Sequence, residues 1–342
     1  MFTRPMLKRK EEEEEEESAL FWPLRKKNGV VPDSEKMHER RWENLCMDCI
    51  TKVFTRVGME SLILSLPFVC TSWYAATLDP LCWQYLYFPD LEPSLLTGPN
   101  STKLESYGPF YDKFVEEYHI ERNRSRFSIT AFIKLVVNRS NGKALELKMP
   151  GFSTEEALRF VSDACPNLRV LNLPDDLQIF KHSGIIPEVI GKWKSLEQLH
   201  LGSNLKKINV LVDVASPRYF SEYLQSSLLA CVCHDNLNKI LEQIGIHCKH
   251  FMGLQLEIEK VDIATASEIV KYLPDIKFLK LIQCYIQNDG IVTLLNGCKE
   301  LETFYVRGDR HSYRYHGFLR RKIIGVYELG APHDWKVIRT MV

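Results

Sequence analysis

The chain has 342 residues, 45% of them hydrophobic and 26% charged, and its 44 basic residues equal its 44 acidic residues. This balance excludes a whole-chain electrostatic attraction to nucleic acid, and the length favours one small domain followed by an extended one. The first residues are charged where a secretion signal needs an apolar run, so we expect a cytoplasmic or nuclear protein whose ten cysteines are thiols.

Residues 1–40 predict a charged tail. They carry seven consecutive glutamates between two basic clusters, Lys8–Lys10 and Arg25–Lys27. A segment with so little apolar material cannot bury enough surface to offset the entropy lost on ordering. The basic clusters are compatible with nuclear import, but a solvated tail explains them more simply.

Residues 41–88 predict a small domain of three short helices. Asp48 can cap a first helix that ends at Gly58 and has apolar residues at helical spacing, namely Ile50, Val53, Phe54 and Val57. A second helix ends at Pro67, and one face of a third is marked by Val69, Cys70, Trp73, Ala76 and Thr77. The stretch Ser61–Leu78 has no charged residue, which raises the question of a membrane span. Its serines, threonines and proline are atypical of a spanning helix, so we expect no membrane insertion.

A repeat with the spacing LxxLxL follows residue 140. Copies begin at Leu168, Leu196, Phe251, Ile276 and Leu301, and an incomplete copy contains Leu145 and Leu147. With Leu145 as the first of them, the middle positions 145, 171, 199, 254, 279 and 304 are separated by 26, 28, 55, 25 and 25 residues. The 55-residue interval is explained either by an insertion at 202–235 or by a degenerate repeat near Tyr223–Val232. The absence of the repeat register there favours the insertion.

Helical patterns with their own start signals separate these strand-like segments. Capping boxes are predicted at Ser153–Glu156 and Thr265–Glu268, and single caps at Asp235 and Asp289. One strand–helix unit cannot bury both apolar faces, whereas stacked units can, so we predict an α/β solenoid over 140–307. Residues 89–139 would then form a linker and N-terminal cap, and 308–342 a C-terminal cap or tail.

The two regions resemble an F-box followed by leucine-rich repeats. The F-box resemblance rests on Leu45, Asp48, Ile50 and Phe54 and on LPFVCTSWYAATLDPLCW, Leu66–Trp83, which is similar to the version in plant F-box proteins that carry such repeats. The repeat resemblance rests on the LxxLxL copies, and Cys165, Cys248 and Cys298 each precede a copy by three residues, where we expect buried apolar groups. One departure is Cys46, which follows Leu45 where many F-boxes have proline.

The resemblance implies a non-catalytic substrate receptor of an SCF-type ubiquitin ligase. In the family, the F-box binds the Skp adaptor and, through it, cullin and RING subunits. The side chains that the resemblance places at or near the adaptor are Leu45, Ile50, Phe54, Leu62, Leu66, Val69, Trp73 and Trp83. The alternative is a protein-interaction scaffold of leucine-rich repeats that works without a ligase.

The outward strand positions of the repeats are the predicted contacts with an unknown target protein. They are Asn172, Gln198, His200, Gln255, Glu257, Lys280, Tyr305 and Arg307, with Glu146 and Lys148 as further candidates. Their charges are mixed, so they predict neither a strongly acidic nor a strongly basic target.

Metal and catalytic sites are not expected, and neither is a cofactor. Cys46 and Cys49 have CxxC spacing without a second pair, and the cluster Cys231–His234, with His247 and Cys248, is tighter than a usual structural zinc site. The chain shows no nucleophile elbow, phosphate-binding glycine loop or metalloprotease helix. The basic segment Arg307–Lys322 is interpreted as part of a polar cap rather than as a nucleic-acid site.

Overall fold

The computed structural model describes residues 45–90, 94–95, 104–106, 108–118, 128–151, 153–174, 184–202, 226–258, 260–282, 284–307, 326–328 and 334–338. They divide into two compact units, one of 45–78 and the described part of 92–127, the other of 79–90 and the described part from 128 onward. The predictions for the tail 1–40 and for the basic residues 308–322 lie outside the described residues.

The first unit is built from short helices around a small apolar core. Helices α2 (Met47–Phe54), α3 (Met59–Leu64) and α4 (Thr71–Thr77) are joined by a 3-10 turn at Leu66–Phe68, whose Pro67 lacks the N–H that a longer helix would need. Phe54 packs edge-on against Trp73 with ring centroids 5.3 Å apart. These contacts tie α2 to α4.

Helix α5 (Pro109–Glu117) also belongs to the first unit. The hydroxyl of Tyr118, which ends α5, donates to the carbonyl of Ile63 at 2.7 Å, and its ring lies 5.7 Å from that of Phe68. A two-stranded antiparallel pair, β2 (Ser94–Leu95) and β3 (Leu104–Ser106), precedes α5. Residues 109–118 therefore pack on α3 and the 3-10 turn that follows it, whereas the sequence predicts that they belong to a linker and cap of the repeats.

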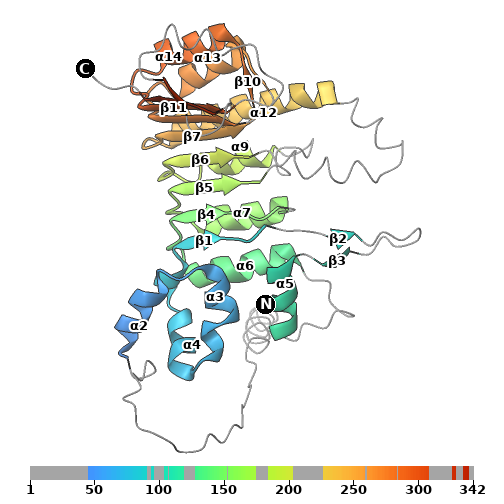
Figure 1. Cartoon of the computed structure of the whole chain (residues 1–342), viewed down its shortest axis with the longest axis vertical. Helices are drawn as coiled ribbons and strands as arrows, with labels where there is room; N and C mark the ends of the chain where they lie inside the picture. Colours follow the sequence, from blue (N-terminus) through green and yellow to red (C-terminus); the bar gives the residue numbers. More distant parts are fainter. Residues whose placement is uncertain are drawn as a thin grey trace, which may run out of the picture. The chain divides into compact units, whose positions relative to one another are not determined.

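The second unit is a nine-stranded sheet with helices along one side (Figure 1). Parallel strands follow one another in chain order: β1 (Tyr85–Tyr87), β4 (Glu146–Lys148), β5 (Val170–Leu173), β6 (Gln198–Leu201), β7 (Gly253–Glu257), β9 (Phe278–Ile282) and β11 (Thr303–Arg307). Two antiparallel strands, β13 (Asp334–Ile338) and β12 (Val326–Glu328), complete the far edge. The order is compatible with an α/β solenoid of leucine-rich repeats.

The connecting helices cover the apolar face of this sheet. They are α6 (Ile129–Ser140), α7 (Glu155–Ala164), α9 (Ile185–Ile190), α12 (Ser226–His247), α13 (Ile263–Tyr272) and α14 (Asn288–Gly297). Two short parallel strands, β8 (Lys260–Val261) and β10 (Tyr285–Ile286), precede α13 and α14. In β5 buried residues alternate with partly exposed ones, since Leu171 and Leu173 are buried and Asn172 is not. The other parallel strands follow the same pattern, except that β7 begins with two buried residues, Gly253 and Leu254.

The strand register corrects one predicted repeat position and adds one strand. Leu147, not Leu145, pairs with Leu171. Leu145 lies two positions earlier, at the start of the strand, where its carbonyl accepts from the Arg169 N–H at 2.8 Å. Leu86 in turn pairs with Leu147. The middle row of buried residues is therefore 86, 147, 171, 199, 254, 279 and 304, and it begins in a segment that the sequence assigned to the F-box.

The 55-residue interval holds one repeat. Strand β6 pairs directly with β7, Leu199 opposite Leu254, so no strand separates them. The interval ends in α12, whose 22 residues make it far longer than its neighbours. The backbone is helical through Asp235, which therefore cannot be the cap that the sequence predicted. Cys231–His234 lie in α12, and their side chains are outside the described residues.

Three cysteines that precede copies of the repeat are buried, as the repeat pattern predicts. Cys165, Cys248 and Cys298 are buried, and the Cys248 thiol donates to the Trp193 carbonyl at 3.4 Å. Burial raises the pKa of each of these three thiols to about 11. They pack as small apolar side chains, as predicted.

Helix starts are the least accurate of the sequence predictions. The cap of α7 is Thr154 rather than Ser153, and that of α13 is Asp262 rather than Thr265. Asp48 and Asp289 lie one residue inside α2 and α14, which begin after Cys46 and Gln287 without a side-chain cap. Several adjacent residues could cap in each case, and the backbone conformation of the preceding turn decides which one does.

We expect Asp262→Ala to lower the free energy of unfolding by about 1 kcal/mol, the usual loss for an N-cap residue. The Asp262 carboxylate accepts from the Thr265 N–H at 3.0 Å and from its hydroxyl at 2.9 Å. Asp289→Ala, also in the first turn of a helix but not at a cap, is the matched control and should cost less. Urea unfolding of both variants checks this, and equal losses would contradict the assignment of the cap.

Candidate functional site

The first unit exposes large apolar side chains that its own core does not use. Leu45, Met47, Val53, Val69 and Leu78 are all exposed, Val53 by 53% and Val69 by 56%; we call them the apolar set. The buried face of α2 is formed by Ile50, Thr51 and Phe54, so its remaining surface is free to carry such residues. Exposed apolar side chains are typical of a surface that binds another protein when they lie together in one patch.

The predicted adaptor residues divide between this surface and the core. Leu45 and Val69 are exposed, and Leu66 and Trp73 are half-buried. Ile50, Phe54 and Leu62 are at most 3% exposed, so in this fold they support the helices and offer no surface to a partner. The adaptor contacts themselves stay a prediction.

Trp83 lies in the second unit and is fully buried. The Asp79 carboxylate accepts from the Leu81 N–H at 2.9 Å and starts a 3-10 helix, Pro80–Trp83. The Arg139 guanidinium lies 5.2 Å from the centre of the Trp83 ring. This aromatic side chain therefore closes the end of the sheet next to α6, and the sequence assignment of Trp83 to the adaptor surface does not fit its position.

On the sheet face opposite the helices, polar residues from successive strands stand side by side in register. This polar row consists of Lys148, Asn172, His200, Gln255, Lys280 and Tyr305. It brings together five of the eight predicted target-binding residues. Gln198 lies one row earlier, opposite Gly253, and Glu257 and Arg307 lie in a later row, on either side of Ile282.

Both lysines of the polar row contact a neighbouring side chain. The Lys280 ammonium lies 5.5 Å from the centre of the Tyr305 ring, and Lys148 pairs with Asp90 at 3.0 Å. At the same edge the Tyr87 hydroxyl donates to Glu146, and burial together with that carboxylate raises the pKa of Tyr87 to about 12. The row therefore combines hydrogen-bonding groups with cations, which suits a polar protein surface better than an apolar ligand.

His200 stands near the middle of the polar row and is the group most sensitive to pH. Burial, and then the charge of Lys280, lower its pKa below the usual 6.5, while Glu146 acts in the opposite direction. The fold therefore favours neutral imidazole. This contribution to stability is complete above pH 6.5 and is lost as the pH falls through the lowered pKa.

We expect His200→Gln to make stability less dependent on pH. Between about pH 7.5 and about pH 5, the free energy of unfolding of the wild-type chain should fall more than that of the variant, because only the wild type must protonate this group on unfolding. Urea titrations at the two pH values check it. Parallel losses in both proteins would show that His200 does not titrate abnormally.

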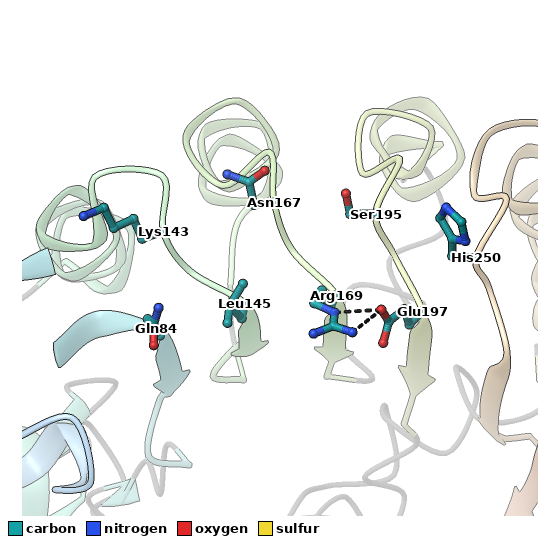
Figure 2. A pocket seen from close by; sticks show the side chains of 8 residues that line it. All are labelled: Gln84, Lys143, Leu145, Asn167, Arg169, Ser195, Glu197 and His250. Carbon is teal, nitrogen blue, oxygen red and sulfur yellow. Dashed lines mark hydrogen bonds and ion pairs between the residues drawn. The ribbon is translucent and has the colours of Figure 1, made fainter. Parts of the chain in front are cut away.

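A shallow groove of about 460 Å³ runs along the edge where the strands begin (Figure 2). Its lining is Gln84, Lys143, Leu145, Asn167, Arg169, Ser195, Glu197 and His250. The Arg169 guanidinium donates to the Glu197 carboxylate at 2.7 Å, and Lys277 and Glu302 pair at 3.1 Å in the equivalent place further along. The groove thus follows the repeat, and ion pairs between neighbouring repeats line this edge.

Curated proteins similar to this chain are F-box proteins of Arabidopsis thaliana. An F-box/LRR-repeat protein is 27% identical over 297 residues, which cover 86% of this chain and 80% of the relative. The F-box protein FBW2 is 20% identical over 87% of this chain and 80% of its own length, and the F-box protein SKIP1 is 22% identical over 71% and 79%. The chain is a relative of the plant F-box/leucine-rich-repeat proteins. No family model matches it.

The sequence does not predict three members of the apolar set, Met47, Val53 and Leu78. The spacing of Ile50, Val53 and Phe54 predicts one apolar helix face, but Val53 is exposed. The available signal was the charge pattern, since Lys52 precedes Val53 in α2 and Arg56 follows just beyond the end of the helix, and both are exposed.

The described part of the chain shows neither a metal site nor a membrane span. No group of three or more His, Cys, Asp or Glu side chains in it is arranged to hold a metal ion. None of its helices combines the length and apolar character needed to cross a membrane.

Proposed function

We propose that the chain is a substrate-recruiting subunit of an SCF-type ubiquitin ligase. The apolar set on the first unit is the observation that carries this proposal, because it leaves an exposed apolar surface on the helices that resemble an F-box. In this proposal the three short helices form the F-box and bind a Skp adaptor, and the sheet with its helices is a leucine-rich-repeat solenoid that binds the target.

In this proposal the adaptor contacts Leu45 and Val69, which the sequence predicted. It also contacts Met47 and Val53, which the sequence did not predict. Burying an exposed aliphatic side chain of this size against a partner contributes about 1.5–3 kcal/mol before the cost of association. Leu66 and Trp73 can contribute at the margin of this surface, since both are half-buried.

The target contact is formed by the polar row with Gln198, Glu257 and Arg307. A row of side chains held in strand register offers a rigid surface, which lowers the entropy cost of binding. Recruitment then acts through proximity: the receptor raises the effective concentration of the target near the conjugating enzyme and contributes no catalytic group of its own. The setting for this role is the cytoplasm, the nucleus or both.

The test is assembly of the full chain with a purified cullin–RING pair, in the presence and absence of a Skp adaptor. The proposal expects cullin to co-purify with the chain only when the adaptor is present. A chain that stays folded and does not retain cullin under either condition would instead support the scaffold of leucine-rich repeats that works without a ligase.

A further inference from the structure

Two exposed thiols lie together at the start of α2. Cys46 is the N-cap residue of the helix and Cys49 is the third residue within it. The Cys49 N–H donates to the Cys46 carbonyl at 3.0 Å, which closes one turn and brings the two residues onto the same side. Residues joined by such a turn have Cα atoms less than about 7 Å apart, within reach of the roughly 4.4–6.8 Å that a disulfide usually spans.

The two thiols are chemically unequal. A hydrogen bond from the Cys49 thiol, and then the Cys49 backbone N–H, lower the pKa of Cys46, and the same thiol contact raises the pKa of Cys49. The positive end of the α2 dipole acts on Cys46 in the same direction. Cys46 is therefore suited to be the attacking thiolate and Cys49 the resolving thiol.

The other described cysteines have different surroundings. Cys82, Cys165, Cys248, Cys284 and Cys298 are buried, and Cys70 is half-buried. Burial raises the pKa of Cys82 to about 11 and that of Cys284 to about 12, so these thiols are protonated and shielded. Reactivity toward soluble oxidants is thus concentrated at the start of α2 in the described part of the chain.

We propose that Cys46 and Cys49 form a reversible dithiol–disulfide couple that responds to the glutathione pool. The Cys46 thiolate attacks one sulfur of oxidised glutathione, which releases one glutathione thiolate and leaves a mixed disulfide on Cys46. Cys49 loses its proton to solvent and attacks the Cys46 sulfur, which releases the second glutathione thiolate and forms the Cys46–Cys49 bond. The two cysteines lose two electrons and the glutathione disulfide gains them.

Oxidation of the couple would change the chain next to two residues of the apolar set. Leu45 and Met47 of the apolar set flank Cys46 in the chain. The disulfide would connect the N-cap of α2 to its first turn, where the structure shows no side-chain cap. The chemistry of the couple does not depend on the proposed adaptor binding, so it can be tested without an adaptor.

The test equilibrates the folded full chain with glutathione at increasing ratios of oxidised to reduced form, followed by acid quenching, trypsin cleavage and mass spectrometry. The tryptic peptide Trp42–Lys52 contains Cys46 and Cys49 and no other cysteine. We expect this peptide to become lighter by two hydrogen atoms as the ratio rises, and to recover its mass in excess reduced glutathione. The peptide containing Cys165 should stay unmodified.

Two single variants complete the test. Cys49→Ser should stop at the glutathione adduct on Cys46. Cys46→Ser should form less adduct, because Cys46, and not Cys49, accepts the backbone N–H at the start of α2 that favours a thiolate. Circular dichroism checks that both variants are folded. The proposal is overturned if the wild-type peptide accumulates only glutathione adducts, or stays fully reduced while free glutathione is oxidised.

Discussion

Replacing Leu45 and Val53 together by aspartate is expected to weaken binding to a Skp adaptor by about 100-fold or more, an effect typical of the central residues of an interface. Both side chains are exposed, so the substitutions leave the core of the first unit intact. Each introduces a carboxylate that would have to lose its water against an apolar partner, which is costly without a paired cation. Isothermal titration calorimetry on purified proteins measures the loss.

Two further variants separate binding from folding. Ile246→Asp places the same carboxylate on an exposed isoleucine of α12 in the second unit, and adaptor affinity should be unchanged. Phe54→Asp instead buries a charge beside Trp73, so we expect loss of helical structure by circular dichroism. An unchanged affinity of the folded Leu45→Asp, Val53→Asp variant would remove the apolar set from the adaptor contact.

Trp83→Ala is expected to lower the free energy of unfolding of the second unit by about 3–5 kcal/mol, the usual loss for a buried tryptophan. Trp83 has no exposed area and lies under the Arg139 guanidinium at the first strand of the sheet. The substitution leaves a cavity there and removes the aromatic ring that the Arg139 guanidinium contacts. The second unit should therefore unfold at lower urea, starting from the end that carries β1.

Tyr85→Ala is the control for Trp83→Ala, because Tyr85 is an exposed aromatic residue only two positions away. It should cost much less. The comparison also tests the corrected position of Trp83: an unchanged stability together with lost adaptor binding would return Trp83 to the adaptor surface that the sequence resemblance suggested.

The strands could be predicted from the sequence because the repeat imposes the same demand at every copy. Each strand must bury two apolar residues on one face, and Leu171 and Leu173 show this as clearly in the sequence as in the sheet. Leu86 obeys the same demand, with buried Trp83 and Phe88 at the other two apolar positions of the spacing. The sequence did not predict this strand because the F-box resemblance extends to residue 88. The boundary between the two compact units lies earlier, after Leu78.

The candidate surfaces were less predictable, for a physical reason. Strand alternation has a period of two, so a buried leucine fixes which neighbours face outward, and five predicted residues did align in the polar row. On a helix of only eight residues a change of one position turns a side chain by about 100°, and adjacent apolar residues compete for the core. Val53 and Phe54 are such neighbours, and only the packing against Trp73 shows which one is buried.

The proposed function requires that the first unit binds a Skp adaptor directly. A calorimetric titration of the purified chain, kept reduced, with a purified plant Skp adaptor tests this. We expect a saturable complex of one chain with one adaptor. A folded chain that gives no binding heat, and no co-elution with the adaptor in gel filtration, would contradict it.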